Sequence, residues 1–162
     1  MKRSDLTLSR FIPGPADEVF DVWFDPASPG GPWHGAKKAL MNVAVDGMFY
    51  FGIERAAHRA HLAEHHGLEL LGRADDLGLD GHFGRFTAVD RPRVAEHTWM
   101  SEYTHGIETH VTVTFVARDG GTQLTIVHRG LPDDEADRAH ERGWTFLLTR
   151  TEQHFASKQS NG

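Results

Sequence analysis

The most constraining feature is a run of alternating apolar and polar residues in the second half of the chain, followed by one long helical pattern. Within 108–118, valine and phenylalanine alternate with threonine. Such alternation is typical of a β-strand that buries one face. Residues 122–129 alternate in the same way, and Asp119-Gly120-Gly121 between the two segments predicts a tight turn. The sequence therefore predicts an antiparallel strand pair here.

Other segments of strand character precede this pair. Asp46-Gly47 lies between two apolar segments, and Asp-Gly is a strong short-range signal for a two-residue hairpin turn. We therefore expect the segments on either side to pair as adjacent antiparallel strands. The further strands expected are 6–12, 41–45, 48–53, 83–89 and 94–103.

Two helices are expected, one near each end of the chain. Pro15 suits the first turn of a helix, and Asp25-Pro26 predicts its end. After Pro132, apolar residues recur at helical spacing over about 24 residues. Strand, helix, antiparallel strands and long helix predict an α+β fold with helices on one side of a sheet. We expect a single domain over 1–162, with a core at 6–155 and a flexible tail at 157–162.

Composition excludes several classes of protein. The chain has no cysteine, so it has neither a disulfide framework nor a thiolate metal site. Its net charge of −6 and pI of about 6.0 have the wrong sign for a nucleic-acid-binding surface. No apolar run approaches the roughly 18 residues that a membrane span needs. We expect a cytoplasmic protein with no nucleic-acid partner, no membrane span and no cofactor.

Residues 54–80 interrupt the strand pattern with alanine-rich, helical sequence. Arg55–His66 resembles one helix, and Gly67 is a suitable C-terminal stop. Segments this long between strands are uncommon in compact domains unless they have a function. We predict a helical insertion that lies as a lid across one end of the sheet.

Five histidines occur in and just after this insertion, and three of them raise the question of a metal site. His58, His61 and His65 would share one face of a helix. His61 to His65 also spells H-x-x-E-H, in which two histidines hold zinc and the glutamate acts as base. A third ligand could come from His58, His66 or Glu69, and nothing in the sequence selects one. We favour a solvated helix face and keep metal binding as an alternative.

Several short strings stand in a characteristic order along the chain. They are Arg10-Phe-Ile-Pro-Gly-Pro, Val43-Ala-Val-Asp-Gly-Met-Phe-Tyr-Phe51, Asp90-Arg-Pro92, His97-Thr-Trp99, Thr122-Gln-Leu-Thr-Ile-Val-His-Arg-Gly130 and Gly143-Trp144. Together they span most of residues 6–155 and leave out the insertion. In their order and spacing they resemble the SRPBCC superfamily (START and Bet v1-like, helix-grip fold), and more closely its branch named after the C-terminal domain of the activator of Hsp90 ATPase.

The resemblance implies a curved antiparallel sheet that grips the C-terminal helix, with a hydrophobic cavity between them. Members of the superfamily bind lipids, sterols, polyketides and other apolar molecules, and some are cyclases or hydrolases. No shared catalytic triad can be transferred to this chain, and a fold by itself does not establish a function.

Alternation along the strands predicts which side chains face the interior. We expect a small apolar or aromatic ligand to bind there, with His97 and His128 as the polar contacts. The predicted lining residues are Trp33, Phe49, Phe51, Ile53, Ala95, His97, Trp99, Leu124, Ile126, His128, Trp144 and Leu147.

Other functions remain open at this stage. An enzyme on the same scaffold could use His97 or His128, or an acid such as Glu96 or Glu102, for proton transfer. A chaperone-regulating partner is suggested by the name of the family branch alone. A homodimer is also possible.

Overall fold

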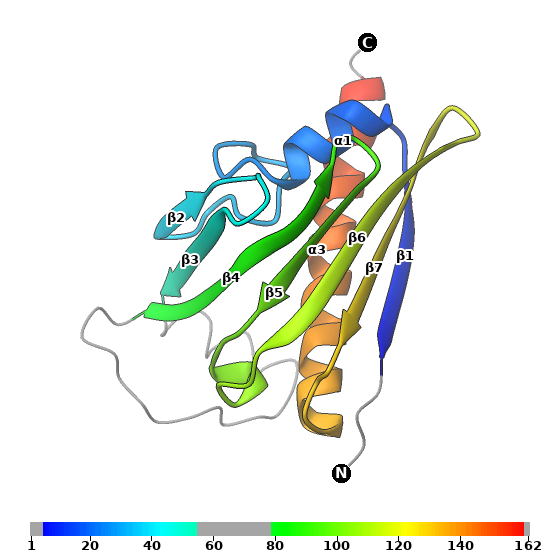
Figure 1. Cartoon of the computed structure of the whole chain (residues 1–162). Coiled ribbons are helices and arrows are strands. Elements are labelled where there is room, and N and C mark those ends of the chain that lie inside the picture. The colour runs from blue at the N-terminus through cyan, green and yellow to red at the C-terminus, as the bar shows by residue number, and fades with distance from the viewer. Residues whose placement is uncertain (1–4, 55–78, 161–162) are drawn as a thin grey trace.

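The fold is a seven-stranded antiparallel sheet with a long C-terminal helix packed across one face (Figure 1). The structure is a computed structural model, and it describes residues 5–54 and 79–160. The strand order is β1-β7-β6-β5-β4-β3-β2. The elements are β1 (Leu6–Ile12), α1 (Ala16–Trp23), β2 (Lys38–Met41), β3 (Met48–Glu54), β4 (Leu79–Asp90), β5 (Val94–Trp99), the 3-10 helix η1 (Glu102–Thr104), β6 (Thr109–Arg118), β7 (Gly121–Arg129) and α3 (Asp134–Ser160).

The predicted pair of strands in the second half is confirmed. β6 and β7 pair along their length, from His110 opposite Arg129 to Arg118 opposite Gly121. In the turn between them, Asp119 (φ 51°) and Gly120 (φ 79°) are both left-handed. Two consecutive left-handed residues match the right-handed twist of the flanking strands. The predicted α+β, helix-grip fold is therefore confirmed, and β1 has the predicted bounds.

The connection between β2 and β3 differs from the predicted two-residue hairpin. β2 ends at Met41, where the predicted strand 41–45 begins. Met41 pairs with Phe49, so residues 42–47 form the connection between the two strands. The prediction of a strand over 41–45 is therefore wrong.

The Asp-Gly pair is used instead to dock this connection on β4. The N–H of Asp46 donates to the carbonyl of Phe86 (2.9 Å), and the N–H of Phe86 donates to the carbonyl of Gly47 (2.8 Å). A Cβ on Gly47 would lie 2.1 Å from the carbonyl oxygen of Asn42, so the close approach requires glycine. Hydrogen bonds to a strand distant in sequence thus decide the conformation of this pair.

Two other elements end elsewhere than predicted. β5 ends at Trp99, short of the predicted residue 103. The chain turns into η1 there, because Ser101 caps this helix and its Oγ accepts the N–H of Tyr103 (3.0 Å). α3 continues to Ser160, so residues 157–160 are helical where the sequence predicts a flexible tail.

The predicted insertion falls almost entirely outside the described residues. Of its residues, Glu54 belongs to β3 and Leu79 belongs to β4, and the two pair with each other. Its predicted helix and lid, with His58, His61 and His65, therefore lie outside the described part of the chain. Of the helices that the structure describes, none is long and apolar enough to cross a membrane.

The main chain of α3 comes closest to β1 and η1. Under α1, phenylalanines pack edge to face, with Phe20 on Phe115 (5.1 Å between ring centroids) and Phe24 on Phe86 (5.6 Å). Large side chains fill the space between α3 and the inner face of β3–β5, and these include most of the predicted lining residues.

Candidate functional site

The candidate site is a group of aromatic side chains between α3 and the β3–β5 part of the sheet. We call Trp33, Phe49, Phe51, Trp99 and Trp144 the aromatic cluster; all five are buried. Phe49 and Phe51 alternate along β3, so both point to the same face as Trp99 on β5. The Trp33 ring lies 4.4 Å from the Phe51 ring and 6.0 Å from the Trp99 ring, between centroids. The structure thus brings together residues from four separate segments of the chain.

Directly beneath α3 the cluster is closed. The ring centroids of Trp99 and Trp144 lie 4.9 Å apart, and Trp144 also stacks on Trp23 at 6.4 Å. Rings at these distances are in contact, so no ligand fits between Trp99 and Trp144 in this arrangement. The cavity expected directly between the helix and β5 is therefore filled by these two side chains.

His128 is held from both sides by neutral hydrogen-bonding groups. The indole N–H of Trp144 donates to Nδ1 (3.1 Å), so in the neutral ring the proton is on Nε2. Nε2–H then donates to Oγ1 of Thr109 (2.7 Å), and the Thr109 hydroxyl donates to the carbonyl of Trp99 (2.7 Å). A proton-transfer role for His128 would first require one of these bonds to break.

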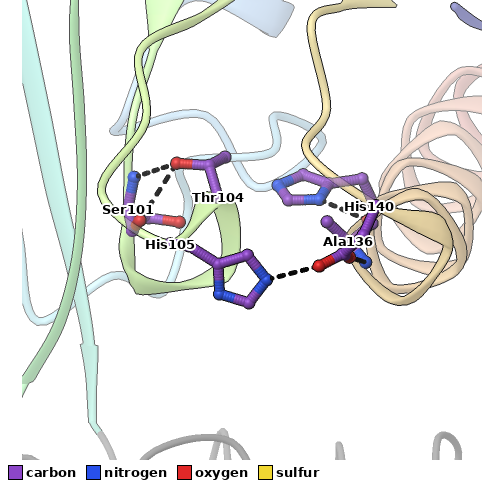
Figure 2. A network of polar contacts seen from close by, with 6 residues as sticks. Ser101, Thr104, His105, Ala136 and His140 are labelled. Atoms are coloured by element: carbon purple, nitrogen blue, oxygen red, sulfur yellow. Dashed lines mark hydrogen bonds and ion pairs between the residues drawn. The ribbon is translucent and has the colours of Figure 1, made fainter. Parts of the chain in front are cut away.

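His140 is a further interior histidine, and the predicted site did not include it. Its Nε2 accepts the indole N–H of Trp99 (3.2 Å), so its proton is on Nδ1, which donates to the carbonyl of Ala136 (2.7 Å). Figure 2 shows His140 and Ala136 at the start of α3, facing the loop that contains η1. The available signal was its position four residues before Trp144, which places both side chains on one helix face.

Burial keeps these histidines neutral. Desolvation lowers the pKa of His97 and of His140 to about 4, and it lowers the pKa of His128 well below its usual value. The neighbouring His140 lowers the pKa of His128 further. At neutral pH these side chains therefore act as uncharged hydrogen-bonding groups.

His97 has one ring nitrogen available. Its Nδ1–H donates to the carbonyl of Thr98 (2.9 Å), which leaves Nε2 as an acceptor. Among the described residues, Nε2 has no hydrogen-bond partner. The ring lies edge to face against Phe49 (4.9 Å), so His97 contacts the aromatic cluster as the sequence predicts.

The sequence analysis also missed two rings beside the cluster. His82 on β4 stacks on Phe51 with ring centroids 4.6 Å apart and on Tyr103 of η1 at 5.6 Å. His82 pairs with Phe51 in the β3–β4 register, which brings their side chains to the same face. The cluster therefore extends to the end of the sheet near Glu54 and Leu79.

Trp33 brings a buried polar group to the site. The side chain is 2% exposed, and its indole nitrogen Nε1 is buried with no hydrogen-bond partner among the described residues. Trp33 comes from the irregular segment before β2, where side chains of α3 donate hydrogen bonds to the backbone on either side of it. Arg150 donates to the carbonyl of His34 (2.8 Å) and Thr151 donates to the carbonyl of Gly30 (2.7 Å).

The other predicted lining residues are placed as follows. Ala95, Leu124 and Ile126 are buried on the inner face of the sheet. Leu147 is half-buried, and Leu148 is the fully buried neighbour on α3. Ile53 lies in β3, and its side chain is outside the described part of the structure. Across residues 5–54 and 79–160, no group of three His, Asp or Glu side chains could hold a metal ion.

Comparisons with known proteins agree with this architecture. The family model described as "Activator of Hsp90 ATPase homolog 1-like protein" matches residues 13–156. The comparison with curated proteins gives no match.

Solved structures from several organisms share the fold. Protein CV1439 from Chromobacterium violaceum is 18% identical with a TM-score of 0.69, covering 94% of this chain and 97% of that one. Protein SA2116 from Staphylococcus aureus is 10% identical with a TM-score of 0.70, covering 99% and 98%. PFC0360w, an HSP90 activator from Plasmodium falciparum, is 16% identical with a TM-score of 0.61, covering 87% of each chain. At these identities the likeness concerns the fold alone.

Proposed function

The chain belongs to the family of Activator of Hsp90 ATPase homolog 1-like proteins, and from this premise we propose that it binds a small apolar or aromatic molecule between the sheet and α3. The observation that supports the proposal is that aromatic and neutral histidine rings fill the interior between α3 and the inner face of β3–β5. Binding sites for small molecules are mostly apolar, with a few placed polar groups. The aromatic cluster has this composition.

The ligand would bind at the Trp33 and Phe51 end of the cluster. Trp99 and Trp144 are in contact with each other, so the space beneath the middle of α3 is already filled. Trp33 instead belongs to an irregular segment and has a buried N–H without a partner among the described residues. Ring side chains can turn as a ligand enters, whereas the hydrogen-bonded His128 would resist displacement.

Binding can be tested with 2-isopropylnaphthalene, which is an uncharged aromatic hydrocarbon. Titration should quench tryptophan fluorescence saturably, because Trp33 and Trp99 lie at the proposed site. Phe51→Ala removes a ring of the proposed site and should weaken binding at least tenfold. Tyr50→Ala is the matched control, since Tyr50 is the neighbouring position on the opposite face of the strand. A melting curve for each variant establishes that it is folded.

The proposal is wrong if no uncharged aromatic probe, neither this hydrocarbon nor an aromatic ketone of the same shape, binds saturably to the folded wild-type protein. It is also wrong if Phe51→Ala and Tyr50→Ala bind the probe equally well while both are folded. In either case the cluster would be a packed core and nothing more.

A second candidate function is regulation of a chaperone of the Hsp90 class, as the family description suggests. One observation favours it: Leu40, Tyr50 and Phe83 are aligned by strand register across the outer face of β2, β3 and β4. Leu40 is 69% exposed and Phe83 is 38% exposed. Such a row of apolar side chains on a surface is typical of a contact with another protein.

This function is tested with a purified Hsp90 chaperone and its ATP hydrolysis rate. The wild-type protein should raise the rate, and Leu40→Ser with Phe83→Ser should abolish the effect without loss of folding. An unchanged rate with the wild-type protein would exclude this role for the chaperone tested.

A further inference from the structure

The indole N–H groups of the tryptophans in the aromatic cluster have different partners. Trp144 donates to His128 (3.1 Å) and Trp99 donates to His140 (3.2 Å). Trp33 is equally buried, yet its Nε1 has no acceptor among the described residues. Burying a donor without an acceptor is unfavourable, because the group loses its hydrogen bonds to water, so Trp33 differs in this respect from the other two tryptophans.

The fold holds Trp33 in place despite that cost. Its ring is surrounded by Phe49 (5.6 Å), Phe51 (4.4 Å) and Trp99 (6.0 Å), between ring centroids. On either side of it along the chain, the carbonyls of Gly30 and His34 accept hydrogen bonds from α3. The side chain therefore cannot satisfy its N–H by turning to solvent without breaking these contacts.

We propose that the molecule bound by this site carries a neutral hydrogen-bond acceptor of the carbonyl class, which accepts the indole N–H of Trp33. This inference rests on the proposed ligand-binding function and specifies its ligand. The described rings that contact Trp33 are uncharged, so a carboxylate bound against them would lose its hydration without an ion-pair partner among these rings and would bind poorly. The flat faces of the same rings favour an aromatic body next to the carbonyl. The ligand class is thus an uncharged aryl ketone or a related aromatic carbonyl compound.

The test uses two probes of nearly equal shape. 2-Acetylnaphthalene has a carbonyl where 2-isopropylnaphthalene has a CH–CH₃ group, and Trp33→Phe keeps a ring while removing the N–H. Trp33→Phe should weaken binding of the ketone by about two- to tenfold, which is the fold-change that loss of one neutral hydrogen bond produces, and should change hydrocarbon binding less than twofold. The ratio of ketone affinity to hydrocarbon affinity is compared between the wild type and Trp33→Phe, so the different hydration of the two probes cancels. Trp23→Phe, which removes a buried indole outside the proposed contact, should leave the ketone-to-hydrocarbon ratio as in the wild type.

A second measurement does not depend on how well the variant folds. In the wild-type protein labelled with ¹⁵N, the indole N–H signal of Trp33 should move downfield when 2-acetylnaphthalene binds and should not do so with 2-isopropylnaphthalene. If neither probe binds the wild-type protein, the proposed function itself fails. If both bind, but the Trp33 signal responds alike to both or Trp33→Phe leaves their affinity ratio unchanged, the ligand-binding function stands and the carbonyl inference is overturned.

Discussion

The indole N–H of Trp144 donates to Nδ1 of His128 across 3.1 Å, in the interior between α3 and β7. The two residues are 16 positions apart in the chain, and both are almost completely buried. The bond determines which nitrogen of His128 carries its proton and thereby the direction of the chain of hydrogen bonds through Thr109.

Replacing Trp144 with phenylalanine should therefore destabilise the protein. The change leaves Nδ1 of His128 buried without a donor, at a cost of about 1–3 kcal/mol in the free energy of unfolding. Urea denaturation of Trp144→Phe, His128→Leu and the double variant measures the coupling. The double variant should be less destabilised than the sum of the two single variants by about 1 kcal/mol. Strict additivity would show that the bond contributes nothing.

The buried histidines predict a loss of stability in mild acid. The folded pKa values of His97, His128 and His140 are lowered, those of His97 and His140 to about 4, below the usual 6.5. The unfolded chain therefore binds protons first as the pH falls below 6.5. Each group lowers the free energy of unfolding by up to about 1.4 kcal/mol per pH unit between these values.

Urea denaturation at pH 7.5, 6.0 and 5.0 measures this dependence. His140→Gln removes one titrating group, so its stability should fall less steeply with pH than that of the wild type. A free energy of unfolding that stays constant from pH 7 to 5 would contradict the neutral, buried state of these side chains.

Asp133 should contribute to stability mainly as the cap of α3. Its Oδ1 accepts the N–H of Ala136 (2.8 Å), while its Oδ2 bonds to Nε2 of the half-exposed His105 (2.9 Å). Figure 2 shows His105 opposite the start of α3, where Ala136 lies. Asp133→Ala should cost about 1 kcal/mol, whereas His105→Gln should cost less than about 0.5 kcal/mol because the pair is exposed.

The same cap has a pH signature. The N–H of Ala136 is the main cause that lowers the pKa of Asp133 below 3.8. The stabilisation that the ionised Asp133 gives the folded protein is therefore present at neutral pH and is lost as the pH falls below that value. The difference between the wild type and Asp133→Ala should therefore shrink in strong acid. Equal effects of Asp133→Ala and His105→Gln at pH 7 would mean that the loop contact matters as much as the cap.

Two glycines should respond to alanine in opposite directions. A Cβ at Gly14 would lie 2.4 Å from Cδ1 of the buried Phe155, so Gly14→Ala should destabilise the protein by about 1–3 kcal/mol. A Cβ at Gly143 in α3 meets no atom of the described residues within 4 Å. Gly143→Ala should therefore stabilise by about 0.5–1 kcal/mol, since alanine is the better helix former. Thermal melts of both variants check the signs, and destabilisation of both would show that α3 is more tightly enclosed at Gly143 than the contacts indicate.

Local patterns in the sequence predict a large part of this fold. Alternation correctly predicts β1 and β6, and Asp119-Gly120 correctly predicts the turn into β7. Asp46-Gly47 shows the limit of the same reasoning. The pair has a strong hairpin signature, yet its hydrogen bonds go to Phe86 on another strand, which no local pattern reveals.

The candidate site could also be predicted only in part. The strand repeat alone sets the direction of a side chain, so periodicity correctly places Phe49, Phe51, His97 and Trp99 on inner faces.

What the amino-acid sequence determined by itself is most of the strands, the two helices α1 and α3, and the face that most side chains occupy. Only the tertiary structure decided which rings meet: that Trp99 closes on Trp144, that His140 bonds to Trp99 from 41 residues away, and that Trp33 is buried with its N–H unpartnered among the described residues. The physical reason is that repeats of 2 and 3.6 residues are set by neighbouring backbone geometry. The depth at which α3 crosses the sheet depends on every large side chain packed between them.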